Sequence, residues 1–119
     1  MIFIIFNWIK FWHVGEHLRM FSKNEEYQRT AVGRYYYPCY LIARDIYNNR
    51  KGRKPGSKIS HKDLIKHFEG LDGEKGKIGD QLRILRDIRN EADYDEFFDV
   101  NKVSDCKIIS EEVLKSLKK

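Results

Sequence analysis

Residues 79–95 read GDQLRILRDIRNEADYD, and apolar side chains recur in this segment at steps of three and four. That spacing places them on one face of an α-helix. Near the end of the segment Arg89 and Asp93 interrupt the apolar face. A charge beside a buried surface must find a partner or lose much of its hydration, so we expect these two side chains to do more than pack. The positions that recur at this spacing are Leu82, Leu85, Ile88 or Arg89, and Ala92.

The same periodicity recurs along the rest of the chain and predicts four more helices. With 119 residues, 41% of them hydrophobic, the chain can build one core and one domain, residues 1–119. We expect an all-α fold, namely an up-and-down antiparallel four-helix bundle with an additional short helix. The expected helices are Phe3 to about Phe21, 25 to about 49, a short one from 61 that ends before Gly70, Lys77 to about Asp95, and Asn101 or Ser104 to about Leu117.

Charge is unevenly distributed along the sequence. The net charge is +5, which permits contact with phosphate groups. Five cations lie within residues 50–58, RKGRKPGSK, whose glycines and proline predict a flexible loop. Such a loop is either a solvated connection or a sequence-independent contact to RNA. The candidate nucleic-acid contacts in this region are Arg50, Lys51, Arg53 and Lys54.

The two cysteines, Cys39 and Cys106, have neither metal-binding nor redox spacing. Each falls on a predicted apolar face, so we expect both to be reduced core residues of a cytosolic protein. The opening run MIFIIF resembles the start of a signal peptide, but Asn7 and Lys10 break it and it is too short to span a bilayer. We therefore expect a cytoplasmic protein that does not enter a membrane.

His13, Glu16 and His17 form the pattern H-x-x-E-H, which occurs in zinc peptidases. The spacing puts both imidazoles on one face of a helix. A catalytic zinc also needs a third protein ligand, and the chain offers no obvious one. We expect these residues to form a solvated helix edge, with no metal and no cofactor bound.

Two longer runs together resemble the HEPN family, the higher eukaryotes and prokaryotes nucleotide-binding proteins. They are RTAVGRYYYPCYLIARDIY at residues 29–47 and LRILRDIRNEADYD at residues 82–95. In that family an Arg-aromatic-Tyr-Tyr run lies on one helix, and an Arg-Asn-x-Ala-Asp-Tyr-type box ends a later one. The resemblance covers roughly Trp8 to Leu117 and implies a helical bundle that forms a homodimer.

The resemblance also implies where a catalytic site would lie. In ribonuclease members of the family, an Arg, the following polar residue and a His act at a dimer interface without a metal. Arg89 matches the Arg and Asn90 the polar residue, whereas Asp93 or Tyr94 takes the place of the His. The candidate catalytic residues are therefore Arg89, Asn90, Asp93 and Tyr94, and Arg34 and Arg86 join the candidate nucleic-acid contacts.

Three functions are left open by these patterns. The first is a nucleic-acid- or nucleotide-related module that partners a minimal nucleotidyltransferase in a toxin–antitoxin-type pair, with Tyr94 as a candidate acceptor of a nucleotide. The second is a metal-independent endoribonuclease toxin whose site lacks the family's His. The third is a purely structural helical dimerisation module. Whichever function holds, the charged residues near the end of residues 82–95 form either a site or an intramolecular ion-pair network, for example Arg34 to Asp93, that ties the second and fourth helices together. The spacing of His61 and His67 predicts no role for either.

Overall fold

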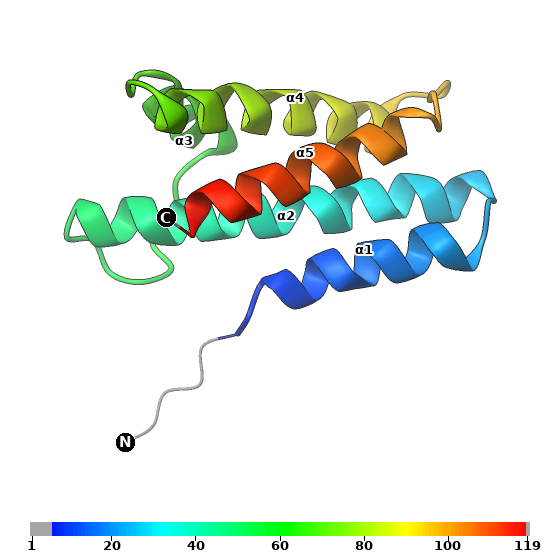
Figure 1. Ribbon diagram of the computed structural model, residues 1–119, viewed down its shortest axis with the longest axis horizontal. Coiled ribbons are helices and arrows are strands. Elements are labelled where there is room, and N and C mark those ends of the chain that lie inside the picture. The colour runs from blue at the N-terminus through cyan, green and yellow to red at the C-terminus, as the bar shows by residue number, and fades with distance from the viewer. Residues whose placement is uncertain (1–5, 119) are drawn as a thin grey trace.

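The computed structural model describes residues 6–118, and five helices account for most of them (Figure 1). The all-α prediction is confirmed: four long helices pack together with one short helix, and the described part of the chain contains no strand. None of these helices is both long enough and apolar enough to cross a membrane. The helices are α1 (Ile9–Phe21), α2 (Glu25–Arg50), α3 (His61–Glu69), α4 (Glu74–Tyr94) and α5 (Lys102–Leu117).

Helix α2 lies in the middle of the molecule, between α1 on one side and α4 and α5 on the other (Figure 1). It contacts all four other helices. Its face at Ala31, Tyr35 and Cys39 is fully buried, as the helical spacing predicts. Helix α1 approaches α2 closely at Gly15, because a Cβ there would lie 3.1 Å from Arg34 Cβ.

Two helix starts differ from the prediction within the described residues. Helix α1 begins at Ile9, whose N–H donates to the Asn7 side chain (3.1 Å), and residues 6–8, which the predicted helix included, are not helical. The start predicted at Phe3, and residues 1–5 of the apolar opening run, lie outside the described residues. Helix α4 begins at Glu74 rather than Lys77, and it takes in Gly76, where a Cβ would lie only 2.4 Å from the Leu71 carbonyl oxygen.

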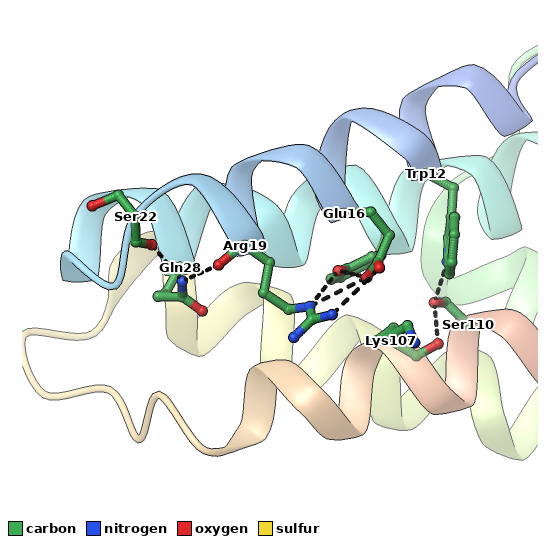
Figure 2. Close-up of polar contacts among 8 residues, drawn as sticks. Trp12, Glu16, Arg19, Ser22, Gln28, Lys107 and Ser110 are labelled. Carbon is green, nitrogen blue, oxygen red and sulfur yellow. Dashed lines mark hydrogen bonds and ion pairs between the residues drawn. The ribbon is translucent and has the colours of Figure 1, made fainter.

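Polar contacts hold α1 against α2 and α5 (Figure 2). Trp12 Nε1 donates to Ser110 Oγ of α5 at 2.8 Å. Arg19 Nε donates to Tyr35 Oη of α2 (3.1 Å) and forms an ion pair with Glu16 (3.2 Å), and the Tyr35 hydroxyl in turn donates to Glu16. These three side chains therefore form a closed network between α1 and α2.

Both cysteines are buried and unpaired, as the sequence predicts. The Cys39 thiol lies 3.5 Å from the Ser110 carbonyl oxygen and 3.6 Å from that of Tyr35. Burial raises the pKa of both thiols, that of Cys106 to about 12. They are therefore protonated core side chains.

Candidate functional site

Helices α2, α3 and α4 bring a group of polar aromatic and basic side chains together. We call it the Tyr–His–Arg cluster, and it consists of Tyr36, Tyr37, Tyr40, His61, Arg86 and Arg89. The tyrosines come from the middle of α2, the histidine is the first residue of α3, and the arginines lie one turn apart on α4.

His61 is the centre of the cluster. Its ring stacks on the ring of Tyr40, with 3.8 Å between centroids and 5° between planes. Its Nδ1 shares a hydrogen bond of 2.5 Å with the hydroxyl of Tyr36, whose side chain is fully buried. Stacking on one tyrosine and bonding to another fix both the position and the orientation of the imidazole.

Local interactions place His61 at this point. Ser60 caps α3, because its side chain accepts a hydrogen bond from the Asp63 N–H (3.0 Å). The Tyr40 hydroxyl donates to the carbonyl oxygen of Ile59 at 2.5 Å. The end of the connecting loop is thus tied to α2 immediately before the helix begins.

The surroundings keep His61 uncharged. Burial, followed by the charges of Arg86 and Arg89, lowers its pKa to about 4. Burial also raises the pKa of Tyr36, although the charge of Arg86 partly opposes this effect. At neutral pH the two arginines therefore face a neutral imidazole and a neutral phenol.

Arg89 makes several contacts within the chain. One Nη donates to Tyr37 Oη (2.7 Å), and the other donates to Asn90 Oδ1 (3.2 Å). Its Nε lies 2.9 Å from Oδ2 of Asp93, one turn further along α4, but the Nε–H is not aligned with the carboxylate and forms no hydrogen bond. Arg89 is therefore positioned by its neighbours and is partly neutralised by one carboxylate.

Arg86 differs from Arg89. It is half-buried, and it forms no ion pair and no hydrogen bond with any residue of the described range 6–118. Its charge nevertheless acts on both His61 and Tyr36. The cluster thus contains one cation that has no counter-charge within the described part of the chain.

Arg34 is not paired as expected. Asp93 pairs with Arg89, so the predicted ion pair between Arg34 and Asp93 is wrong. The Arg34 guanidinium lies instead over the ring of Phe11, 5.0 Å from its centroid, and 5.8 Å from that of Tyr37. Because the Arg89 guanidinium is 5.2 Å from the same Tyr37 ring, this tyrosine links both arginines.

The remaining candidate catalytic residue, Tyr94, is at the edge of this region. Its side chain is 74% exposed, and its ring centroid lies 5.8 Å from the Arg89 guanidinium. Arg89, Asn90, Asp93 and Tyr94 therefore do form one contiguous group, at the end of α4.

The four basic residues of the loop region lie apart from this group. Arg50, Lys51 and Lys54 are exposed. Arg53 is more restrained, since it donates to the Lys58 carbonyl oxygen (2.8 Å) and lies over the ring of Tyr47 at 5.5 Å. The predicted nucleic-acid contacts thus fall into two groups, one at the cluster and one at the end of α2.

Sequence reasoning missed His61 and Tyr36. The sequence predicted a short helix from residue 61, but nothing in the spacing indicated that the start of this helix would contact the tyrosines of α2. His67 lies outside the cluster, with its ring edge-on to Tyr47 at 4.8 Å.

The H-x-x-E-H residues are engaged in packing and ion pairing. Glu16 is bonded to Arg19 and Tyr35, so the expectation of a solvated edge is wrong for this residue. His13 packs edge-on against Trp12 (5.4 Å) and His17 stacks on Phe21 (5.8 Å). Within the described residues, no three His, Cys, Asp or Glu side chains are grouped so as to hold a metal ion.

Two archaeal proteins are similar to this chain. The uncharacterized protein MJ0628 of Methanocaldococcus jannaschii is 34% identical over 107 aligned positions, covering 76% of this chain and 64% of that protein. The uncharacterized protein MJ0992 of the same organism is 32% identical over 127 aligned positions, covering 92% of this chain and 70% of that protein. No family model matches, and no solved structure matches significantly. The chain belongs to the same family as MJ0992.

Proposed function

We propose that the protein is a HEPN-like module that binds the phosphate groups of RNA or of a nucleotide at the Tyr–His–Arg cluster. The observation that carries this proposal is the state of Arg86, a half-buried guanidinium with no counter-charge among the described residues. Its neighbours His61 and Tyr36 are both neutral at pH 7. A guanidinium in such a setting binds phosphate strongly, because it is weakly hydrated and offers paired donors.

The rest of the cluster suits a phosphate-bearing ligand. Arg89 supplies a second cation, and Tyr37 lies between it and Arg34. An incoming phosphate would compete with Asp93 for Arg89, whereas it would meet no such competitor at Arg86. We therefore assign Arg86 the larger share of the binding energy.

A salt titration of RNA binding tests this assignment. The measurement is the fluorescence anisotropy of a labelled single-stranded RNA, with wild-type protein, Arg86→Gln and Arg83→Gln. Arg83 is the matched control, because it lies on the same helix but pairs with Glu69 at 2.6 Å outside the cluster. We expect Arg86→Gln to weaken binding about tenfold and to reduce the salt dependence by about one phosphate contact.

Two outcomes would contradict phosphate binding at the cluster. The first is that wild-type protein fails to bind RNA, and also fails to bind AMP and ATP, at low salt. The second is that Arg83→Gln weakens binding as much as Arg86→Gln, which would indicate a diffuse electrostatic attraction by the whole basic surface.

The partner in this proposal is a minimal nucleotidyltransferase, in a toxin–antitoxin-type pair, with the HEPN-like chain as a homodimer. Support comes from the resemblance of residues 29–47 and 82–95 and from the exposed hydroxyl of Tyr94, which could accept a nucleotide. Co-expression with a nucleotidyltransferase encoded nearby, followed by mass spectrometry, tests this. An added nucleotide that disappears in Tyr94→Phe is expected, and an unmodified Tyr94 would exclude the modification.

His61 favours a second candidate function, that of a metal-independent endoribonuclease. An uncharged imidazole beside two arginines can accept the proton of a ribose 2′-hydroxyl while that oxygen attacks the phosphorus and the 5′-oxygen leaves. The leaving oxygen takes a proton from solvent, and the products carry a 2′,3′-cyclic phosphate and a 5′-hydroxyl. His61 would then supply the imidazole that residues 82–95 lack.

Cleavage of an RNA pool with EDTA present tests the ribonuclease function. We expect His61→Ala and Arg89→Ala to abolish cleavage, and His67→Ala to leave it unchanged, because His67 lies on the same helix but outside the cluster. If wild-type protein cleaves nothing while still binding RNA, the ribonuclease function is excluded and the binding module remains.

A further inference from the structure

A hollow lies away from the Tyr–His–Arg cluster, between the C-terminal half of α2 and the loop that follows it. It has a volume of about 530 Å³, and Trp8 is one of the residues that line it. No residue of the cluster lines it. The residues that line it include Trp8, Arg44, Asp45, Asn48, Arg53 and Pro55.

Two buried polar atoms that have no hydrogen-bond partner among residues 6–118 belong to residues that line this hollow. They are Nε of Arg44 and Oδ1 of Asn48, and the second side chain is almost completely buried, at 1% exposure. The two residues are one turn apart on α2, so they share a face of the helix. Buried polar groups in proteins are nearly always paired, so two orphans at one hollow call for an explanation.

The hydrogen bonds around these two atoms show which kind of ligand group each residue can bind. Nδ2 of Asn48 donates to the carbonyl oxygen of Ser57 at 3.0 Å, which identifies the other amide atom as the free acceptor. Arg44 is poorly neutralised, because its Nη2 lies 3.9 Å from Asp45 Oδ1. The second oxygen of Asp45 accepts from Trp8 Nε1 at 3.1 Å, which holds the carboxylate toward the indole.

We propose that this hollow binds a small planar molecule that carries an anionic group and a hydrogen-bond donor. The anion, a carboxylate or a phosphate, pairs with Arg44 and Arg53. The donor, an amino or ring N–H, bonds to Asn48 Oδ1. Trp8 and Pro55, which also line the hollow, provide apolar contacts for the ring. The proposal does not depend on RNA binding at the cluster.

Spectra of ¹⁵N-labelled full-length chain provide a direct test, since the protein has two indole N–H groups. The Trp8 indole N–H lies at the hollow, whereas that of Trp12 is bonded to Ser110 and serves as an internal control. The carboxylate probes are the three isomers of aminobenzoate, with benzoate lacking the donor and aniline lacking the anion. The phosphate probes are AMP and inorganic phosphate.

We expect at least one aminobenzoate, or AMP, to shift the Trp8 signal with an affinity about tenfold higher than that of benzoate, aniline or inorganic phosphate. Arg44→Gln should abolish the shift. Arg50→Gln, which removes a neighbouring exposed cation, and Arg86→Gln, which removes the cation of the cluster, should both retain it. An unchanged Trp12 signal verifies that each variant is folded.

Three results would overturn the proposal. The first is that no probe moves the Trp8 signal at about 10 mM, a concentration that detects weak fragment binding. The second is an equal shift in wild-type protein and folded Arg44→Gln. The third is equal affinity for inorganic phosphate and AMP, together with equal affinity for benzoate and the aminobenzoates, which would reduce the hollow to a simple anion site.

Discussion

The imidazole of His61 lies parallel to the phenol ring of Tyr40, with 3.8 Å between the ring centroids. This contact joins the start of α3 to the middle of α2, and the hydrogen bond between His61 Nδ1 and Tyr36 strengthens the same connection. The ring that we assign to the site is therefore also part of the packing between two helices. Its protonation should affect stability as well as function.

Acid should weaken the fold through His61. Its pKa is about 4 in the folded chain against 6.5 for an ordinary histidine, so between these values the unfolded chain binds more protons. The contribution of neutral His61 to the free energy of unfolding is then fully present above pH 6.5, and it falls as the pH drops toward 4. Because the ring is partly exposed, we expect a loss of about 1–2 kcal/mol rather than the full value of the shift.

Urea unfolding at pH 7 and pH 4.5 measures this loss. Carboxylates also titrate in that range, so the comparison is with His61→Gln, which lacks the imidazole but keeps a polar side chain. The decrease in unfolding free energy should be smaller in the variant by about 1 kcal/mol or more. Equal decreases in the two proteins would show that His61 is not held neutral by its surroundings.

Helical spacing was sufficient to predict most of the fold. Leu82, Leu85, Ile88 and Ala92 are all buried, as one face of a helix requires. The errors lie at helix starts, where single contacts decide the boundary. The Asn7 side chain accepts a hydrogen bond from the first residue of α1. The first turn of α4 packs closely on Leu71 because Gly76 has no Cβ. Neither contact has a periodic signal in the sequence.

The candidate site was predictable only where its contacts are local. The pairing of Arg89 with Asp93 follows from their separation of one helical turn. The contact of His61 with Tyr36 and Tyr40 joins residues more than twenty positions apart, and it depends on how α3 packs against α2. For the same reason the partner of Arg34 could not be read from the sequence.

Replacing a glycine by alanine should change stability in opposite directions at two positions on the long helices. A Cβ at Gly79 would lie 2.4 Å from the Glu69 backbone nitrogen, so Gly79→Ala must push α3 away from α4. At Gly33 a Cβ would meet no atom within 4 Å. In urea unfolding we expect Gly79→Ala to lose about 2–3 kcal/mol and Gly33→Ala to gain about 0.5–1 kcal/mol. A fully stable Gly79→Ala would contradict the packing of α3 on α4.

The two thiols should be unreactive until the chain unfolds. Cys39 and Cys106 are buried, and burial raises the pKa of each, so the reactive thiolate is scarce at neutral pH. We expect no reaction with Ellman's reagent at pH 7.5 in native buffer and reaction of both thiols in urea. Rapid labelling of the native protein would mean that the core around Ser110 opens readily.

Asp93 should restrain phosphate binding. Its carboxylate lies 2.9 Å from Arg89 Nε and is partly exposed, so its attraction to the arginine is modest. Replacing it in Asp93→Asn leaves Arg89 without a competing anion, and we expect RNA affinity to rise about two- to fivefold. Asp87→Asn is the control, since it removes the same charge from an exposed position of α4. If both variants bind more tightly by the same factor, net charge explains the gain. If Asp93→Asn instead binds more weakly, the carboxylate positions Arg89, and it is a supporting residue of the site.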